Sequence, residues 1–336
     1  MLEHGGRLHA AATHYGIPLA DWLDLSTGIN PQPWPVPPIP AVAWLRLPEE
    51  DDGLNEIAAA YYGCAAEHLL PLPGSQAGIQ LLPRLIAPSE VAMLQPTYAE
   101  HPVAWRAAGH RVVELPAAKL LASSARIIVL IQPNNPSGSI FPVDALLAVA
   151  QRQAARGGFL LIDEAFIDAT PALSLAAHTG QAGLLILRSL GKFFGLAGAR
   201  VGFLLAPPDL LAAAREALGP WPLSGPARHV SQLALADRPW QAAARQGLQA
   251  ASLRLAALLA ALPRLETCRA EAQPTVAGCA LFRWLPHPQA AAWQLQLAQK
   301  GILIRYFEQL SALRFGLPGD EAQWQRLQQA LAVLKA

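Results

Sequence analysis

The chain has 336 residues, and its 25 Lys and Arg against 24 Asp and Glu leave a formal net charge of +1. Only 15% of the residues are charged and 53% are hydrophobic, which excludes a disordered chain, because disorder combines low hydrophobicity with high net charge. The near-zero net charge also excludes a nucleic-acid binder that relies on a basic face. A chain of this length is expected to form two domains, at about 100 to 200 residues each.

The cysteines and the N-terminal residues bear on the cellular setting. Cys64, Cys268 and Cys279 have no C-x-x-C spacing, so the sequence predicts no metal site and a reduced, cytoplasmic environment. The segment 1–7 lacks the basic and apolar regions of a secretion signal, and no run of 18 apolar residues occurs. We therefore expect neither secretion nor a membrane partner.

The first two thirds of the chain alternate between short apolar runs and helical spacing. Before them, seven of the 30 prolines lie between Pro31 and Pro48, which disfavours any helix there and predicts an extended arm. A mostly parallel sheet covered by helices on both faces is typical of the alternation that follows. The expected strands are 91–94, 112–115, 127–131, 159–162, 184–187 and 201–205, and the expected helices are 54–62, 99–108 and 143–155.

The pattern changes after Pro207, where long helices rich in Ala, Leu, Gln and Arg are predicted. Strands and helices then mix, which indicates an α+β second domain. The expected helices are 209–218, 227–236, 240–262, 289–299 and 320–334, and the expected strands are 277–284, 301–305 and 312–316.

Functional residues of a parallel sheet are expected just past the carboxyl ends of its strands. Gly74-Ser75 opens a helix at Gln76, and the free N–H groups of such a helix end can bind a phosphate. A plain helix cap is the alternative. Asn135 follows a buried strand between two prolines that restrict its backbone, although a simple turn would look the same.

Two charged residues follow later strands. Asp163 ends a buried run and needs a cationic partner, unless it serves only as a helix cap or in a salt bridge. Lys192 has apolar neighbours, which predict a lowered pKa and a free amine able to form a Schiff base; a solvated loop lysine is the alternative. Ser189-Leu190-Gly191-Lys192 also matches the S-x-x-K of penicillin-binding acyl enzymes, but their partner motifs S-D-N and K-T-G are missing downstream.

The order and spacing of these motifs resemble fold-type I pyridoxal-phosphate enzymes, the aminotransferase class I/II group, over nearly the whole chain. The resemblance implies an α/β fold with a large domain, whose mostly parallel central sheet is covered by helices, a smaller α+β domain and an N-terminal arm. It implies a homodimer as well. The implied ranges are 1–50 for the arm, which is part of the small domain, 51–225 for the large domain, and 226–336 for interdomain helices and the small domain.

The same resemblance implies pyridoxal 5'-phosphate as cofactor and assigns roles to residues. Lys192 would form the Schiff base, Asp163 would hold the ring nitrogen protonated, and Tyr98 would stack on the ring; these three are the implied catalytic residues. Asn135 would donate to the ring hydroxyl oxygen. The implied cofactor-binding residues are Gly74, Ser75, Gln76, Tyr98, Asn135, Asp163, Ser189, Lys192 and Arg200.

Three segments resemble the threonine-phosphate decarboxylases of this group more than the histidinol-phosphate aminotransferases. They are the opening around His4 and 24–31, Phe166 in place of the aminotransferases' usual Tyr, and Trp221. This resemblance implies decarboxylation of L-threonine O-3-phosphate, a phosphorylated amino acid, to the aminopropanol phosphate used in cobalamin synthesis. Transamination of histidinol phosphate and a cofactor-less binding protein remain alternatives. Leu47 departs from the family, in which a Tyr often reaches the partner's cofactor phosphate.

Substrate-binding residues follow from the same comparison of motifs. Arg314 would bind the substrate carboxylate. For binding the substrate phosphate, Arg305 is a stronger candidate than His4 or the backbone of Gly5 and Gly6, since a guanidinium suits phosphate oxygens. A surface strand residue is the alternative for Arg305, and a frayed terminus for His4. The predicted set is His4, Gly5, Gly6, Thr27, Gly28, Asn135, Arg305 and Arg314.

Overall fold

The computed structural model describes residues 4–262 and 276–334, so Cys268 lies outside the described residues. The chain divides into two compact units. The small unit consists of 1–32, 136–138 and 244–336, and the large unit of 33–135 and 139–243. Residues 33–50 and 226–243 thus group with the large unit, and the ranges expected from the sequence stay predictions.

A seven-stranded sheet with the order β2-β8-β7-β6-β5-β3-β4 forms the centre of the large unit. Neighbouring strands are parallel from β4 to β7, whereas β8 is antiparallel to both β7 and β2. The predicted mostly parallel sheet is therefore confirmed. The strands are β2 (Leu69–Leu72), β3 (Glu90–Leu94), β4 (Arg111–Leu115), β5 (Ile127–Ile131), β6 (Phe159–Asp163), β7 (Leu184–Ser189) and β8 (Gly202–Leu205).

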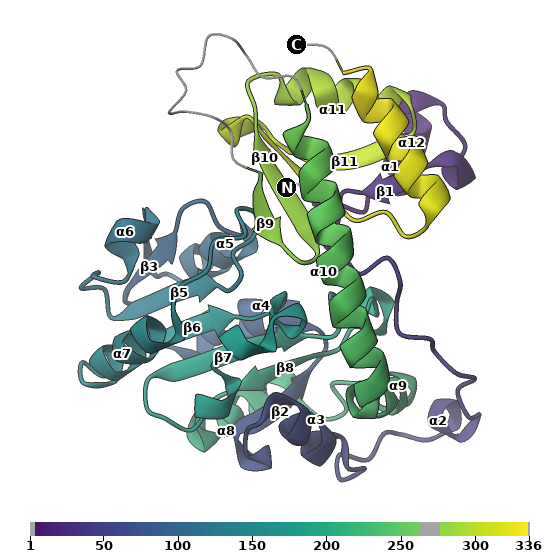
Figure 1. The fold of residues 1–336 in the computed structure, drawn as a ribbon. Coiled ribbons are helices and arrows are strands. Elements are labelled where there is room, and N and C mark those ends of the chain that lie inside the picture. The colour runs from purple at the N-terminus through teal and green to yellow at the C-terminus, as the bar shows by residue number, and fades with distance from the viewer. Residues whose placement is uncertain (1–3, 263–275, 335–336) are drawn as a thin grey trace. The chain divides into compact units, whose positions relative to one another are not determined.

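Helices pack along this sheet, as Figure 1 shows. Ile79, Trp105 and Leu211, from three different helices, share one buried core with Leu161 and Leu187 of the sheet. Burying such side chains stabilises the unit by roughly 1.5 to 3 kcal/mol each. The helices of the large unit are α2 (Val42–Leu45), α3 (Leu54–Tyr62), α4 (Ser75–Leu85), α5 (Glu100–Ala107), α6 (Ala117–Leu120), α7 (Val143–Ala154), α8 (Pro208–Leu218) and α9 (Gly225–Ala236).

The small unit has a five-stranded sheet with the order β1-β11-β12-β10-β9, in which β1 runs parallel to β11. The division between the units falls within α10 (Arg238–Ala260). The strands are β1 (Leu23–Leu25), β9 (Ala277–Cys279), β10 (Phe282–Pro286), β11 (Ile302–Phe307) and β12 (Ala312–Gly316), and the other helices are α1 (Leu8–Tyr15), α11 (Ala290–Gln299) and α12 (Glu321–Ala332).

Two expectations about elements are wrong. The single strand expected at 277–284 is the hairpin of β9 and β10, in which Phe282 pairs with Cys279. Its turn residues Ala280 and Leu281 are buried and apolar, so no polar turn signal interrupts the sequence. The arm between Pro31 and Pro48 contains the short helix α2, because 41–47 is free of proline.

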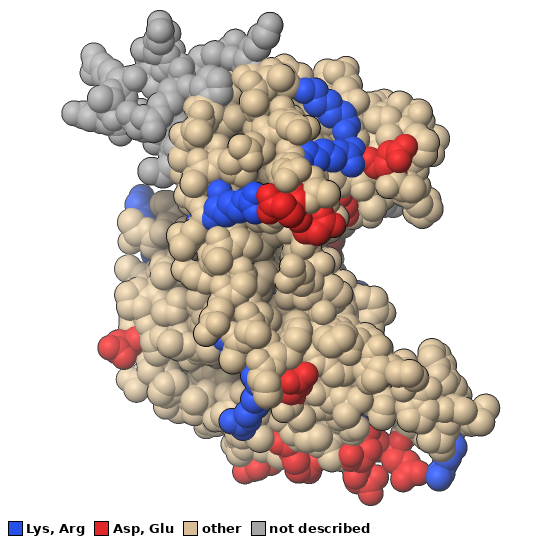
Figure 2. Space-filling model, turned by 45° about the vertical axis from the view of Figure 1, so that its right-hand side comes forward, with Lys and Arg blue, Asp and Glu red and all other residues tan. Residues whose placement is uncertain are grey.

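Charged side chains are sparse on the surface, in keeping with the composition. On the face drawn in Figure 2 they lie in small separate groups with neutral surface between them. Of the helices in the described part of the chain, none combines the length and the apolar character needed to cross a membrane.

Close packing at Gly202 yields a first test. An added Cβ would lie 2.4 Å from the backbone nitrogen of Ser75 and 2.7 Å from the carbonyl oxygen of Arg188, so Gly202→Ala should lower the free energy of unfolding by about 1 to 3 kcal/mol. The control is Gly247→Ala in α10, where nothing lies within 4 Å and alanine should stabilise the helix by about 0.5 to 1 kcal/mol. Urea denaturation of both variants measures the difference, and equal effects would contradict the packing argument.

Candidate active site

The end of β7 and the start of α4 lie together around Gly202. Gly202 pairs with Ser189 across β7 and β8, and it also packs against the backbone nitrogen of Ser75. Gly74, with a positive φ of 78°, precedes the helix, and no side chain caps it there. The first N–H groups of α4 therefore have no partner within the helix, which is the arrangement that attracts an anion.

Two side chains add to this anion-attracting helix end. The Arg200 guanidinium lies so close to Gly74 that a Cβ there would be 2.6 Å from Nη2, so only glycine leaves room for it. Arg200 is exposed and itself has a left-handed φ of 54°. The Ser189 hydroxyl accepts a hydrogen bond of 3.2 Å from the Gly191 N–H, which leaves its proton for another acceptor. Predicted phosphate-binding residues are thus brought together.

Asp163, at the end of β6, has a buried histidine as partner. Its Oδ2 lies 3.1 Å from Nε2 of His101, and its Oδ1 accepts a 3.0 Å hydrogen bond from the Ala165 N–H. The Asp163 side chain is only 5% exposed and that of His101 is not exposed at all. The partner of this strand-end carboxylate is therefore a buried histidine, which no local sequence signal indicates.

Lys192 lies beside the residue that departs from the aminotransferase pattern. Its Nζ is 5.6 Å from the centroid of the Phe166 ring, which is buried, while Lys192 is half-buried. The loop around it is held by Phe194, whose ring stacks on Trp240 and whose carbonyl accepts a 2.9 Å hydrogen bond from the Trp34 N–H. The lysine is thus carried by a loop anchored at several points.

Of the remaining predicted cofactor residues, Tyr98 follows β3, Asn135 follows β5 and Gln76 lies in α4. Tyr98 is half-buried, and its hydroxyl lies 3.5 Å from Oε1 of Gln76. The Gln76 amide also donates to Glu100 at 3.0 Å, so its side chain is held in the first turn of α4. Asn135 is 9% exposed and follows the cis bond between Gln132 and Pro133.

In the small unit, Arg305 and Arg314 lie directly opposite each other on β11 and β12. Cross-strand partners share a face, and both guanidinium groups lie near Phe307, at 5.0 and 6.0 Å from its ring. Arg314 is 7% exposed, whereas Arg305 is half-buried. Two guanidinium groups on one face of the sheet provide donors that a single anionic molecule can use together.

Ser26, at the end of β1, joins the other predicted substrate residues. Its carbonyl oxygen accepts a 2.8 Å hydrogen bond from Arg314 Nη2, and its hydroxyl oxygen accepts one of 2.7 Å from the Gly6 N–H. Gly5 packs on the same carbonyl, because a Cβ there would lie 2.3 Å from it. The next residue, Thr27, has its carbonyl oxygen 2.3 Å from where a Cβ of Gly316 would lie. Ser26 thus contacts Arg314, Gly5 and Gly6, although it is not among the predicted site residues.

The predicted residues therefore form two groups. The large unit contains Gly74, Ser75, Gln76, Tyr98, Asn135, Asp163, Ser189, Lys192 and Arg200, and the small unit contains His4, Gly5, Gly6, Thr27, Gly28, Arg305 and Arg314. His4 is exposed and Gly28 is buried. The first group fits pyridoxal phosphate by its chemistry: an anion-attracting helix end with a guanidinium, a buried carboxylate for a ring nitrogen, and an amine.

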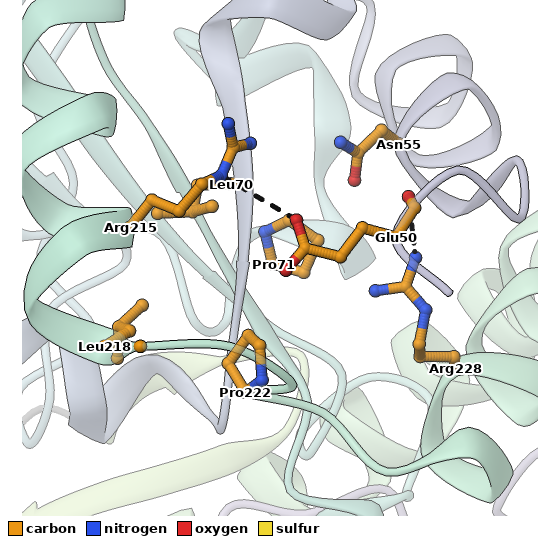
Figure 3. A pocket seen from close by; sticks show the side chains of 9 residues that line it. Glu50, Asn55, Leu70, Pro71, Arg215, Leu218, Pro222 and Arg228 are labelled. Carbon is orange, nitrogen blue, oxygen red and sulfur yellow. Dashed lines mark hydrogen bonds and ion pairs between the residues drawn. The ribbon is translucent and has the colours of Figure 1, made fainter. Parts of the chain in front are cut away.

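A different part of the large unit holds a pocket that none of the predicted site residues lines (Figure 3). Arg215 Nε lies 3.8 Å from Oε2 of Glu50 across it, and Arg228 donates a 3.1 Å hydrogen bond to the Glu50 carbonyl oxygen. Charged side chains that line this pocket are thus already bound to Glu50 within the protein. Among residues 4–262 and 276–334 no cluster of three or more His, Cys, Asp or Glu suits a metal ion.

Comparison with known proteins matches the family model described as aminotransferase class I and II to residues 48–331. A protein of Pseudomonas aeruginosa named threonine-phosphate decarboxylase is 53% identical over 100% of this chain and 98% of its own length. A Sinorhizobium protein of the same name is 44% identical over 98% of each chain.

Among solved structures, histidinol-phosphate aminotransferase from Sinorhizobium meliloti, in complex with pyridoxal-5'-phosphate, superposes with a TM-score of 0.79. It is 19% identical and the match covers 98% of this chain and 97% of that one, so it supports the fold alone. The predicted fold and the resemblance from which it came are confirmed. With the family model matched over most of its length and decarboxylase-named relatives aligned from end to end, this chain belongs to the class I and II aminotransferase family.

Proposed function

We propose that this chain is a pyridoxal-phosphate-dependent decarboxylase of L-threonine O-3-phosphate. The observation that carries the proposal is the 53% identity, over the full length of the chain, to a protein named threonine-phosphate decarboxylase. Phe166 beside Lys192 agrees with it, because it removes the hydroxyl that the aminotransferases usually place there. Transamination of histidinol phosphate, the other predicted activity, has no comparable support.

The residues of the large unit would hold the cofactor. Its phosphate would lie at the start of α4, with Ser75, Ser189 and Arg200 as donors and Gly74 leaving the space that Arg200 needs, and its ring nitrogen would face the Asp163 carboxylate. When bound, pyridoxal phosphate supplies an electron-accepting ring that takes up the electron pair left when the carboxylate departs as carbon dioxide.

The protein's own groups then have three tasks. Asp163, held by His101 at 3.1 Å, presents its carboxyl group to the ring nitrogen. Lys192 Nζ holds the cofactor and afterwards delivers a proton to the substrate carbon, so that the product (R)-1-amino-2-propanol O-2-phosphate gains one proton for the carbon dioxide released. Arg314 and Arg305 bind the substrate carboxylate and phosphate, as their guanidinium geometry favours.

The family resemblance also supports a homodimer in the cytoplasm that contributes to cobalamin synthesis. Val42, Trp44, Leu45 and Leu47 expose apolar side chains on or next to α2, by 57%, 66%, 82% and 66%. An apolar cluster of this kind suits a surface that a second protein chain covers.

The products of the reaction distinguish decarboxylation from transamination. Purified protein loaded with pyridoxal phosphate should release carbon dioxide from L-threonine O-3-phosphate without any added 2-oxo acid, because decarboxylation needs no amino acceptor. Carbon dioxide release, measured with carboxyl-labelled substrate, checks this. The proposal is wrong if none is released and histidinol phosphate is transaminated instead.

Lys192 tests whether the protein is an enzyme or only a binding protein on the same fold. Lys192→Ala should abolish the visible absorbance of the bound cofactor and reduce carbon dioxide release by at least about 100-fold, because a general acid–base group contributes about 10² to 10⁴. Lys119→Ala, at an exposed lysine, is the matched control and should leave both unchanged. Full activity in Lys192→Ala would rule out its assigned role.

Arg305 tests the phosphate anchor. Arg305→Ala should raise the KM for L-threonine O-3-phosphate by about 10- to 100-fold, since a hydrogen bond to a charged group is worth about 1.5 to 3 kcal/mol. The kcat should change far less, because this contact is made equally before and during the reaction. Steady-state kinetics measure both, and an unchanged KM would show that another residue anchors the phosphate.

A further inference from the structure

A buried ionic network lies behind the cofactor site proposed above. Arg188, Glu164 and Asp168 have side chains that are 3%, 0% and 1% exposed. Arg188 Nη1 donates to Glu164 Oε2 at 2.7 Å, and Nη2 bonds Asp168. One guanidinium thus serves two carboxylates inside the large unit.

Other hydrogen bonds complete the network. Glu164 also accepts from the Ser174 hydroxyl at 2.6 Å and from the Leu175 N–H at 2.7 Å. Asp168 accepts from the Tyr61 hydroxyl at 2.9 Å, while the Arg188 guanidinium lies 4.4 Å from the centroid of the Tyr62 ring. The network therefore ties together helix α3, the end of β7 and the loop that follows β6.

Burial and the neighbouring charges together shift the pKa values of Glu164 and Arg188. Burial raises the pKa of Glu164 although Arg188 opposes the shift. For Arg188, burial acts to lower the pKa, but the carboxylates of Asp168 and Glu164 together raise it above its usual range. The guanidinium remains charged, and it is the group that keeps the buried carboxylates compatible with the core.

The position of the network in the sequence relates it to the site. Glu164 directly follows Asp163, and Arg188 directly precedes Ser189. Successive residues of a strand point to opposite faces, so Asp163 and Ser189 project from one side of the sheet and Glu164 and Arg188 from the other. Asp163 accordingly bonds His101 of α5, whereas Arg188 lies against Tyr62 of α3.

We propose that Arg188 and Glu164 are positioning residues: their buried pair fixes the ends of β6 and β7 so that Asp163 and Ser189 keep the spacing that pyridoxal phosphate requires. This inference rests on the proposed function. Neither residue touches the site from its own face, so each acts through its chain neighbour. A guanidinium fork is needed because one group must donate to two carboxylates at once.

The test compares two buried arginines. Arg188→Lys keeps the charge but loses the fork, and it should weaken pyridoxal phosphate binding by about 10-fold or more, the size of effect known for residues that orient metal ligands from behind. The control is Arg228→Lys on α9, where the arginine is 4% exposed and bonds Asp52 through Nε at 2.7 Å. This variant should be destabilised without losing cofactor affinity.

Two readouts separate positioning from a merely structural role. Titration of cofactor-free protein with pyridoxal phosphate gives the Kd, and the pH midpoint of the visible absorbance reports the surroundings of the bound ring. Both should shift in Arg188→Lys and match the wild type in Arg228→Lys. Unchanged values in Arg188→Lys, or equal losses in both variants, would overturn the inference.

A milder variant provides the test if Arg188→Lys fails to fold. If Arg188→Lys is not folded by circular dichroism, Ser174→Ala decides. It removes the 2.6 Å hydrogen bond to Glu164 and the bonds that the Ser174 hydroxyl oxygen accepts from Arg188 Nη1 at 3.0 Å and from the Ala176 N–H at 3.1 Å, but it leaves the ion pair in place, so both readouts should shift in the same direction by less. Wild-type values in Ser174→Ala would then refute the positioning role. Wild-type protein that binds no pyridoxal phosphate would instead contradict the proposed function.

Discussion

The ends of the two parallel strands β6 and β7 constrain the rest of the large unit. Because side chains alternate along a strand, each end presents one polar group to each face of the sheet. On one face are Asp163 and Ser189, and on the other are Arg188 and Glu164, the residue that directly follows β6 and bonds Arg188. Buried polar and charged groups need partners. Asp163 therefore bonds His101 on one face, and Glu164 bonds the Arg188 guanidinium on the other.

The segments next to these strand ends also bring polar groups together. Close approach of the β8 backbone at Gly202 brings the start of α4 to Ser189, and Gly74 leaves the space that Arg200 fills. In the small unit, Arg305 and Arg314 lie opposite each other on adjacent strands, where both guanidinium groups can donate to an anion. Although the protein has few charged residues, several of its buried ones, Asp163, Glu164, Arg188 and Arg314, lie at or next to the predicted site.

Much of the fold was predictable because its signals are local. β5, at Ile127–Ile131, has the uninterrupted apolar run of a strand covered on both faces, and α3, at Leu54–Tyr62, has helical spacing with glycines at both ends. Where the signal was ambiguous the prediction failed: the hairpin turn at Ala280 and Leu281 is apolar and buried, so it read as continuous strand. β1 and β2 are short and were not recognised.

The sequence by itself determined the type of sheet, the family and the residues whose order matches the family motifs, since these depend on local pattern and spacing. Only the tertiary structure decided which groups are partners. His101 meets Asp163 from 62 positions away, Arg188 meets Glu164 from 24, and Ser26 meets Arg314 from 288. Such pairs have no local signature, because a buried charge specifies that it needs a partner but not where in the chain the partner lies.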